Sequence, residues 1–150
     1  MQLRDFFEPR ALALPLAAQT TDAVLPELIS QLGLDHRAST GLLKVLLRRE
    51  ELGSTGVGRG IAIPHSRSLL VNRVRLAYGH LPVGVLWGSQ DHRPVHHFFL
   101  ILAPPIEVSN QYLPILGKIA TFAKEADVPH RLSQLSAPDE FFRLLEEKGV

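Results

Sequence analysis

Apolar residues recur at three- and four-residue spacing in four stretches of the chain, a pattern that predicts amphipathic helices. In the first stretch the apolar positions follow a Thr-Thr-Asp cluster of N-cap residues at 20–22 and end at Gly33. The predicted helices cover residues 22–32, 39–51, 109–124 and 138–147. Each of them is expected to bury one apolar face against a shared core.

Three other stretches have the patterns of β-strands. Residues 71–81 alternate in part between apolar and polar positions, as expected of a strand with one buried face. Residues 95–103 form a nearly continuous apolar run, which is typical of a strand covered on both faces. A short apolar stub at residues 61–63 stops at Pro64. Because helices and strands are interspersed and no linker divides the chain, the sequence predicts one α/β (α+β layered) domain over residues 1–150. Its small mixed β-sheet is expected to be flanked by helices on both faces.

The composition is that of a globular protein and excludes several functional classes. Of the 150 residues, 45% are hydrophobic and 21% are charged, so the chain has enough apolar side chains to form a core. The net charge of +1 lacks the positive excess of a nucleic-acid-binding surface, and no nucleic-acid partner is expected. The absence of cysteine excludes disulfides, iron–sulfur clusters, cysteine-ligated zinc and thiol catalysis.

A short apolar run at residues 11–18 resembles part of a targeting segment. Pro15 interrupts this run, and the residues before it include the acids Asp5 and Glu8. A signal peptide has a cationic head and an unbroken apolar core, so these residues argue against one. No stretch approaches the roughly 20 apolar residues that span a bilayer. The sequence therefore predicts a cytoplasmic protein that does not insert into membranes.

The glycine-rich segment G-S-T-G-V-G-R-G at residues 53–60 leads to a histidine. It lacks the Gly-Lys-Ser/Thr ending of a Walker A loop and the G-x-G-x-x-G spacing of a dinucleotide site, which argues against nucleotide binding. Pro64 fixes the backbone just ahead of His65 and presents its imidazole from a stiff position. Neutral imidazole is a nucleophile near pH 7 and forms covalent intermediates. The residues alone leave two interpretations open: a phosphoryl-accepting histidine or an ordinary turn histidine.

Polar and charged residues around this histidine provide candidate contacts to a phosphoryl group. The hydroxyls of Ser54 and Thr55, together with the free amides of the glycine loop, can donate hydrogen bonds to an anion. The guanidinium groups of Arg49, Arg59 and Arg67 can make charge-assisted, bidentate contacts to phosphoryl oxygens. These residues are therefore candidate phosphoryl-binding groups beside the histidine.

Residues 49–65, R-E-E-L-G-S-T-G-V-G-R-G-I-A-I-P-H, resemble the signature of phosphotransferase-system enzyme IIA domains of the fructose, mannitol and nitrogen-regulatory type. The resemblance extends more weakly over the whole chain. It includes the D-x-x-P-V block at residues 91–95, the Ala-Pro pair at 103–104 and a helix beginning near Tyr112. A free-standing chain of this length is most similar to the nitrogen-regulatory branch. The resemblance implies a mixed β-sheet flanked by helices, in agreement with the hydrophobic pattern.

The same resemblance implies a function for His65. Family members accept a phosphoryl group on this histidine from the phosphohistidine of the carrier HPr or its nitrogen-branch counterpart, and Arg49 stands close to the phosphorylated ring. Sugar-transporting members pass the group to a IIB domain, whereas nitrogen-regulatory members bind regulatory target proteins according to phosphorylation state. Transfer between two imidazoles rests on positioning and charge stabilisation, so no metal and no organic cofactor is expected.

The sequence departs from the family pattern where the family places a second active-site histidine. The matching pattern reads Y-L-P-I-L at residues 112–116, so Tyr112 occupies that position, or Gln111 if the alignment shifts by one residue. A tyrosine hydroxyl can donate a hydrogen bond to a phosphoryl oxygen but does not titrate near neutral pH. In addition, His96 stands where the family commonly has an acidic residue. Two functions therefore remain open: a phosphohistidine carrier, or a regulatory docking module that has lost efficient phosphotransfer.

Four further histidines lie close together in the sequence: His80, His92, His96 and His97. His96 and His97 are consecutive and point to opposite faces of a strand, which disfavours joint chelation of one ion. His92 and His96 have the i, i+4 spacing of helical metal ligands, but Pro94 between them argues against a helix. The sequence therefore does not favour a metal site. One of the four remains a candidate to face the pocket of His65 and to replace the missing histidine in part.

Overall fold

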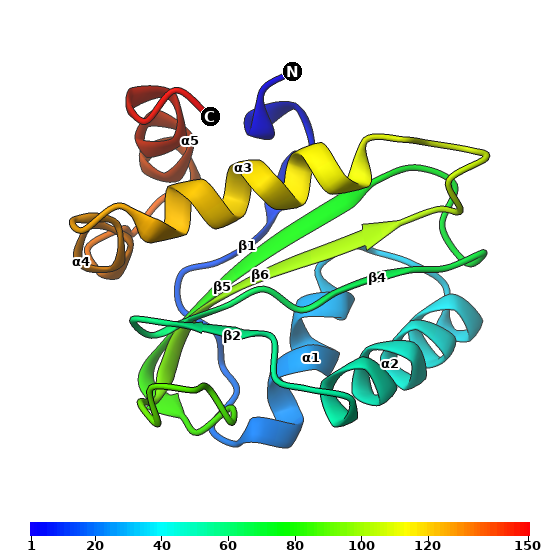
Figure 1. Cartoon of the computed structure of the whole chain (residues 1–150), viewed down its shortest axis with the longest axis horizontal. Coiled ribbons are helices and arrows are strands. Elements are labelled where there is room, and N and C mark those ends of the chain that lie inside the picture. The colour runs from blue at the N-terminus through cyan, green and yellow to red at the C-terminus, as the bar shows by residue number, and fades with distance from the viewer.

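The computed structural model describes all 150 residues and contains one six-stranded sheet with helices on both of its faces (Figure 1). The strands are β1 (Phe7–Ala13), β2 (Gly56–Gly58), β3 (Ile61–Ala62), β4 (His65–Arg67), β5 (Arg75–Val85) and β6 (Val95–Ala103). The helices are α1 (Thr21–Ser30), α2 (His36–Glu51), α3 (Tyr112–Lys124), α4 (Val128–Ser133) and α5 (Pro138–Glu147), and a short 3-10 helix, η1 (Leu3–Asp5), precedes them. No helix combines the length and the apolar character needed to cross a membrane.

Strand β6 lies in the centre of the sheet and organises the other strands. It pairs antiparallel with β5, where Tyr78 lies opposite Phe99, and parallel with both β3 and β4. Strand β1 extends the sheet beyond β5 in parallel, and β2 extends the other side as an antiparallel hairpin with β3. The resulting order is β1-β5-β6-β3-β2. The sheet is therefore mixed, as predicted.

The two faces of the sheet are covered by different helices. Helices α3, α4 and α5 lie on one face, and α1 and α2 lie on the other (Figure 1). Along β6, Phe99 and Ile101 belong to the first core, whereas Phe98 and Leu100 belong to the second, because successive side chains of a strand alternate between its faces. All four side chains are fully buried. This alternation explains the unbroken apolar run of β6 and confirms the prediction that it is covered on both sides.

The structure corrects the predicted start of two helices. Helix α2 begins three residues earlier than predicted, because the carboxylate of Asp35 accepts a hydrogen bond from the backbone N–H of Ala38 at 2.7 Å. Helix α3 begins at Tyr112 rather than near Ser109. The hydroxyl oxygen of Ser109 instead accepts a hydrogen bond from the backbone N–H of Gln111 at 3.3 Å and holds the turn before the helix.

Several elements are not indicated by the sequence pattern: β1, α4, the short strands β2 and β4, and η1. Strand β1 contains Pro9 and ends inside the apolar run at residues 11–18, which resembles part of a targeting segment. Proline is tolerated there because β1 is the edge strand of the sheet. The run is explained by burial, since Ala11 and Leu12 are both buried between the sheet and its helices. Helix α4 has only 6 residues, which is too short for a helical period to stand out.

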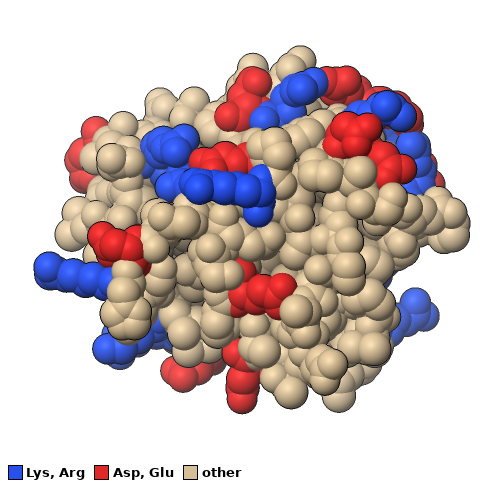
Figure 2. Space-filling model, turned by 180° about the vertical axis from the view of Figure 1, so that it is seen from behind, with Lys and Arg blue, Asp and Glu red and all other residues tan.

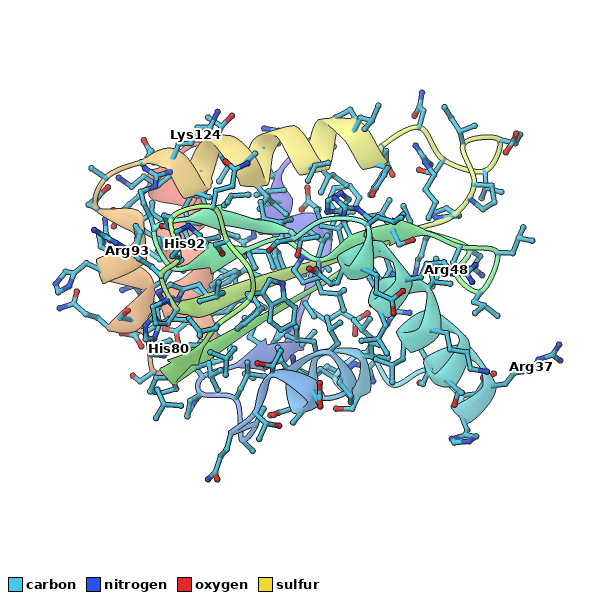
Figure 3. All side chains as sticks on the ribbon, turned by 60° about the horizontal axis from the view of Figure 1, so that its bottom comes forward. Arg37, Arg48, His80, His92, Arg93 and Lys124 are labelled. Carbon is cyan, nitrogen blue, oxygen red and sulfur yellow. The ribbon has the colours of Figure 1, made fainter.

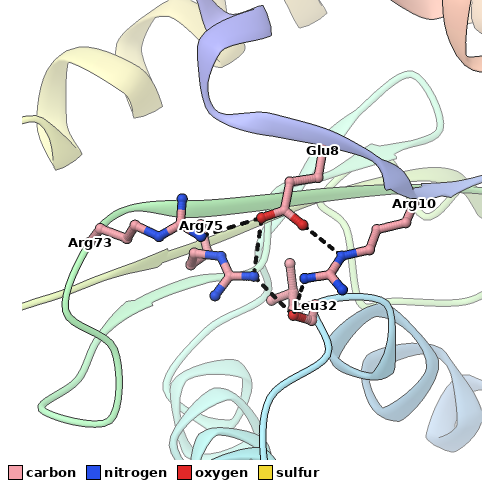
Figure 4. Close-up of polar contacts among 5 residues, drawn as sticks. All are labelled: Glu8, Arg10, Leu32, Arg73 and Arg75. Atoms are coloured by element: carbon pink, nitrogen blue, oxygen red, sulfur yellow. Dashed lines mark hydrogen bonds and ion pairs between the residues drawn. The ribbon is translucent and has the colours of Figure 1, made fainter.

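A cluster of charged side chains joins β1 to β5 and to the segment after α1 (Figure 4). The carboxylate of Glu8 accepts hydrogen bonds from Arg10 at 2.7 Å, from Arg75 at 3.3 Å and from Arg73 at 3.4 Å. Arg10 and Arg75 also donate to the carbonyl oxygen of Leu32, at 3.3 and 2.9 Å. The hydrogen bond from Arg10, supported by the charges of Arg75 and Arg73, holds the pKa of Glu8 below its usual value. The view from behind shows charged side chains concentrated in the upper part of that face, with separate charged side chains at its left side, centre and bottom (Figure 2).

Candidate functional site

His65 is the first residue of β4, and its backbone is fixed by the central strand of the sheet. It lies opposite Ile101 of β6, and the carbonyl oxygen of Pro64 accepts a hydrogen bond from the N–H of Ile101 at 2.9 Å. The glycine-rich segment before it forms the β2–β3 hairpin, whose turn residues Arg59 and Gly60 have left-handed φ values of 57° and 78°. Positive φ at both central positions is what a tight two-residue hairpin turn requires. The half-buried imidazole is therefore carried by the sheet and not by a free loop.

The imidazole ring of His65 is oriented by a backbone carbonyl group. Its Nδ1 lies 2.6 Å from the carbonyl oxygen of Ile63. A carbonyl oxygen only accepts hydrogen bonds, so Nδ1 carries the hydrogen and donates it. In the neutral ring the lone pair is then on Nε2. This arrangement selects Nε2 as the nucleophilic atom of the side chain.

The structure places Tyr112 beside this ring and Arg67 over the ring of Tyr112. The ring centroid of Tyr112 lies 6.1 Å from that of His65, and the guanidinium carbon of Arg67 lies 4.6 Å from the centroid of the Tyr112 ring. Arg67 is held in place because its Nη1 donates to the carbonyl oxygen of Pro104 at 2.9 Å. Burial raises the pKa of Tyr112, and the positive charge of Arg67 opposes that rise. The hydroxyl of Tyr112 is therefore protonated at neutral pH and available as a donor.

Arg49 lies in the last turn of α2, a helix that packs against β4, and its charge acts on Tyr112. Its Nη1 donates a hydrogen bond to the carbonyl oxygen of Gly53 at 2.7 Å. The positive charge of Arg49 also opposes the rise in the pKa of Tyr112. Two guanidinium groups, from Arg49 and Arg67, thus contribute positive potential at Tyr112, whose ring lies beside His65.

The hydroxyl groups of Ser54 and Thr55 are used inside the glycine-rich segment. Ser54 Oγ donates to the carbonyl oxygen of Trp87 at 2.6 Å. Thr55 is only 4% exposed. Its hydroxyl donates to the carboxylate of Glu50 and accepts a hydrogen bond from Trp87 Nε1 at 3.2 Å. The role of these two hydroxyls as donors to a phosphoryl group stays a prediction.

Glu50 and Trp87 belong to this arrangement although no sequence pattern indicates it. Glu50 sits in a charged cluster that looks like a solvated helix end, and Trp87 lies 37 positions after it in the chain. Both contact Thr55, and Glu50 also accepts a hydrogen bond from the Thr55 backbone N–H at 3.1 Å. Together they fix the conformation of the chain between Arg49 and the hairpin. Only the tertiary structure reveals this role, because Trp87 is distant in sequence.

The expectation that another histidine faces His65 is wrong. In the β5–β6 pairing His80 lies opposite His97, whereas His65 lies opposite Ile101, four residues further along β6. A strand rises about 3.3 Å per residue, so the two positions are roughly 13 Å apart. His92 lies beyond this end of β6, in the turn between β5 and β6. The structure contains no group of three or more histidine, aspartate or glutamate side chains arranged to hold a metal ion.

Comparisons with known proteins agree with the resemblance carried by residues 49–65. A family profile described as "Phosphoenolpyruvate-dependent sugar phosphotransferase system, EIIA 2" matches residues 5–148 of the chain. The chain is also 30% identical over 133 residues to a nitrogen regulatory protein of Bradyrhizobium diazoefficiens, which spans 88% of this chain and 86% of that protein.

Solved structures with the same fold confirm the predicted layered architecture. The nitrogen regulatory protein IIA-Ntr from Neisseria meningitidis superposes with a TM-score of 0.86 at 24% identity, over 95% of this chain and 98% of that one. The complex of mannitol enzyme IIA with phosphorylated mannitol enzyme IIB from Escherichia coli contains a chain that superposes with a TM-score of 0.72. That match has 19% identity over 94% of this chain and 97% of the other.

Proposed function

Because the chain belongs to the EIIA 2 family of the phosphoenolpyruvate-dependent sugar phosphotransferase system, we propose that it carries a phosphoryl group on His65, received from the phosphohistidine of an HPr-type carrier. In this step the P–N bond of the donor histidine breaks as a new P–N bond forms at Nε2 of His65. The electron pair of the broken bond stays on the donor imidazole. No further co-reactant is needed.

One observation supports this proposal most directly: the hydrogen bond from Nδ1–H of His65 to the carbonyl oxygen of Ile63, at 2.6 Å. It leaves the lone pair on Nε2 in the neutral ring, and it still has its acceptor once Nε2 is phosphorylated. The positive charges of Arg49 and Arg67 stabilise the phosphoryl oxygens in this proposal, and Tyr112 donates a hydrogen bond to one of them.

Ser54 and Thr55 have a supporting role in this proposal. Their hydroxyl hydrogens are already donated to Trp87 and Glu50. They therefore act through the shape of the glycine-rich segment, whose backbone amides are the candidate donors to the phosphoryl group. A direct contact from either hydroxyl requires that it first give up its present hydrogen bond.

In this proposal a second protein either receives the phosphoryl group from His65 or binds the chain according to the phosphorylation state of His65. The mannitol enzyme IIA of similar fold is known in a complex with a phosphorylated IIB enzyme. The relative from Bradyrhizobium diazoefficiens is a nitrogen regulatory protein. We therefore propose two destinations: transfer to a IIB domain, or binding to regulatory target proteins according to the phosphorylation state of His65.

A second candidate function is a regulatory docking module of the same fold without efficient phosphotransfer. The observation that favours it is Tyr112, which stands beside the His65 ring where the family usually places a histidine. Because burial raises its pKa, the hydroxyl of Tyr112 does not ionise near neutral pH. In this case the partner proteins bind the unmodified surface around His65.

Phosphorylation with purified components separates the two functions. The protein is incubated with phosphoenolpyruvate, enzyme I and the HPr-type carrier, and its mass is measured. Phosphotransfer adds about 80 Da; His65→Ala should abolish the gain, and His80→Ala, at the far end of the sheet, should retain it. If the organism's own carriers add no phosphoryl group to the intact protein, the docking module replaces the carrier as the function.

A further inference from the structure

A cavity lined by Arg59, histidines and two prolines opens at the opposite end of the sheet from His65. It has a volume of about 440 Å³, and the apolar rings of Pro82 and Pro129 form part of its wall. Its walls include Arg59, His80, His96, His97, His130 and Ser133. These residues come from the β2–β3 turn, the ends of β5 and β6, and helix α4. The volume lies within the range of small-molecule sites, roughly 300–1,000 Å³.

One wall of the cavity is a fixed chain of hydrogen bonds that begins in the core. The buried hydroxyl of Tyr78 lies 2.8 Å from Nδ1 of His97, and Nε2 of His97 lies 3.3 Å from Ser133 Oγ. Ser133 Oγ in turn donates to the carbonyl oxygen of Pro129 at 3.0 Å. Burial lowers the pKa of His97 to about 3, so this ring is neutral at physiological pH. His97 therefore acts as a rigid wall of the cavity and not as its titrating group.

The other polar groups of the cavity are cationic or become so by protonation. His80 stacks on His97 with ring centroids 5.1 Å apart, and both burial and the neighbouring His96 lower its pKa. Arg59 Nη2 donates to the carbonyl oxygen of Ala123 at 2.6 Å, and Nη1 donates to that of Lys124. This leaves three of the five N–H groups of Arg59 for another acceptor.

No carboxylate lines the cavity. The titratable and charged groups around the cavity include the basic residues Arg59, His80, Arg93, His96, His97, Lys124, His130 and Arg131 and the acids Asp91, Glu125 and Asp127. Asp91 accepts hydrogen bonds from the backbone N–H groups of Arg59 and Arg93. Glu125 and Asp127 pair with Lys148 on the side of α5. At this end of the molecule His80, His92, Arg93 and Lys124 gather, away from Arg37 and Arg48 (Figure 3).

We propose that this cavity is a binding site for a small phosphate-bearing anion, distinct from the phosphoryl site at His65. The anion is held by the free N–H groups of Arg59 and by hydrogen bonds from the imidazoles of His80 and His130, and His80 takes up a proton as the anion binds. Burial, together with the neighbouring His96, lowers the pKa of His80 and disfavours its protonation. An anion reverses that balance, so binding takes up protons and strengthens as the pH falls.

Sulfate is a suitable probe because its charge of minus two does not change in the neutral range, whereas that of inorganic phosphate does. The protein is titrated with sulfate at about pH 6 and at about pH 8, in the presence of a chelator, while the Cε1–H resonances of the histidines are followed by NMR. We expect binding to weaken by up to about tenfold per pH unit between the two conditions, because one proton is taken up with the anion. Inorganic phosphate should displace the sulfate.

Variants locate the site. His80→Gln and His130→Gln should each weaken sulfate binding about tenfold, since each removes a charge-assisted hydrogen bond. His36→Gln, at the start of α2 and exposed, is the matched control and should bind as the unmodified protein does. Having two separate variants keeps the test valid if one of them fails to fold. Equal affinity at both pH values, equal affinity in all three variants, or resonance shifts confined to His65 would overturn the proposal.

Discussion

Tyr112→Phe removes one oxygen atom from the site beside His65 and leaves the rest in place. The Tyr112 side chain is only 9% exposed, its ring lies 6.1 Å from that of His65, and the Arg67 guanidinium sits 4.6 Å above it. Phenylalanine keeps the ring, its packing and the cation–π contact. The substitution therefore isolates the hydroxyl group.

The expected effect follows from the strength of one hydrogen bond. A hydrogen bond to a charged group contributes about 1.5–3 kcal/mol. A tenfold change in rate corresponds to about 1.4 kcal/mol, so loss of a bond that forms only in the transition state slows transfer roughly 10- to 100-fold. Burial raises the pKa of Tyr112, so the hydroxyl stays protonated and the effect should not depend on pH in the neutral range. Tyr112→His should exceed the unmodified protein in rate, because imidazole also donates and carries charge near neutral pH.

Rapid-quench measurements of phosphoryl transfer from the phosphorylated carrier test this reasoning. Thermal unfolding of each variant serves as the control, and Tyr112→Phe should shift it little because the packing is retained. Transfer at the unmodified rate in Tyr112→Phe would show that the hydroxyl does not touch the phosphoryl group. A rate in Tyr112→His that is unchanged or slower would contradict the idea that the tyrosine limits transfer.

Three further outcomes are expected. Arg49→Ala should slow phosphoryl transfer about tenfold or more by removing a charge-assisted contact, with the circular dichroism spectrum unchanged; loss of folding instead would refute its proposed role. Glu8→Gln should lower the free energy of unfolding by about 1 kcal/mol in denaturant titrations. Because the pKa of Glu8 is lowered in the folded state, its stabilisation is present above the unfolded pKa and is lost as pH falls through the folded one. The unmodified protein should therefore lose more stability in acid than Glu8→Gln does, and parallel acid curves would argue against the cluster. Thr55→Val should cost about 1–3 kcal/mol by leaving Oε1 of Glu50 and the Trp87 N–H without their partner, while the bond from the Thr55 backbone N–H to Glu50 is kept. It should also change the tryptophan fluorescence; an unchanged spectrum and stability would speak against that network.

The central strand and its layers could be predicted because local pattern and tertiary environment agree there. The unbroken apolar run of β6 has one physical explanation, burial on both faces, and Phe98 and Phe99 do lie in opposite cores. β1 could not be predicted in the same way. Pro9 argues against a strand, and only the edge position in the sheet makes it acceptable.

In the candidate site, too, some features could be predicted from the sequence and others depend on the tertiary structure. His65 and Arg49 lie within one contiguous motif, so the sequence alone can single them out. The stacking of Arg67 on Tyr112 depends on the pairing of β4 with β6 and on the start of α3, segments that are far apart in the chain. The separation of His65 from the other histidines depends on strand register, which no local pattern contains.

Helix α3 is shared between the two ends of the molecule. Tyr112 begins it beside the nucleophilic ring, and its last carbonyl groups are held by the guanidinium of Arg59. An α-helix of 13 residues is a stiff rod roughly 20 Å long. A ligand that drew Arg59 away from those carbonyls would release the far end of the rod that positions the phenol. Helix α3 therefore links ligand binding at Arg59 to the position of Tyr112 beside His65.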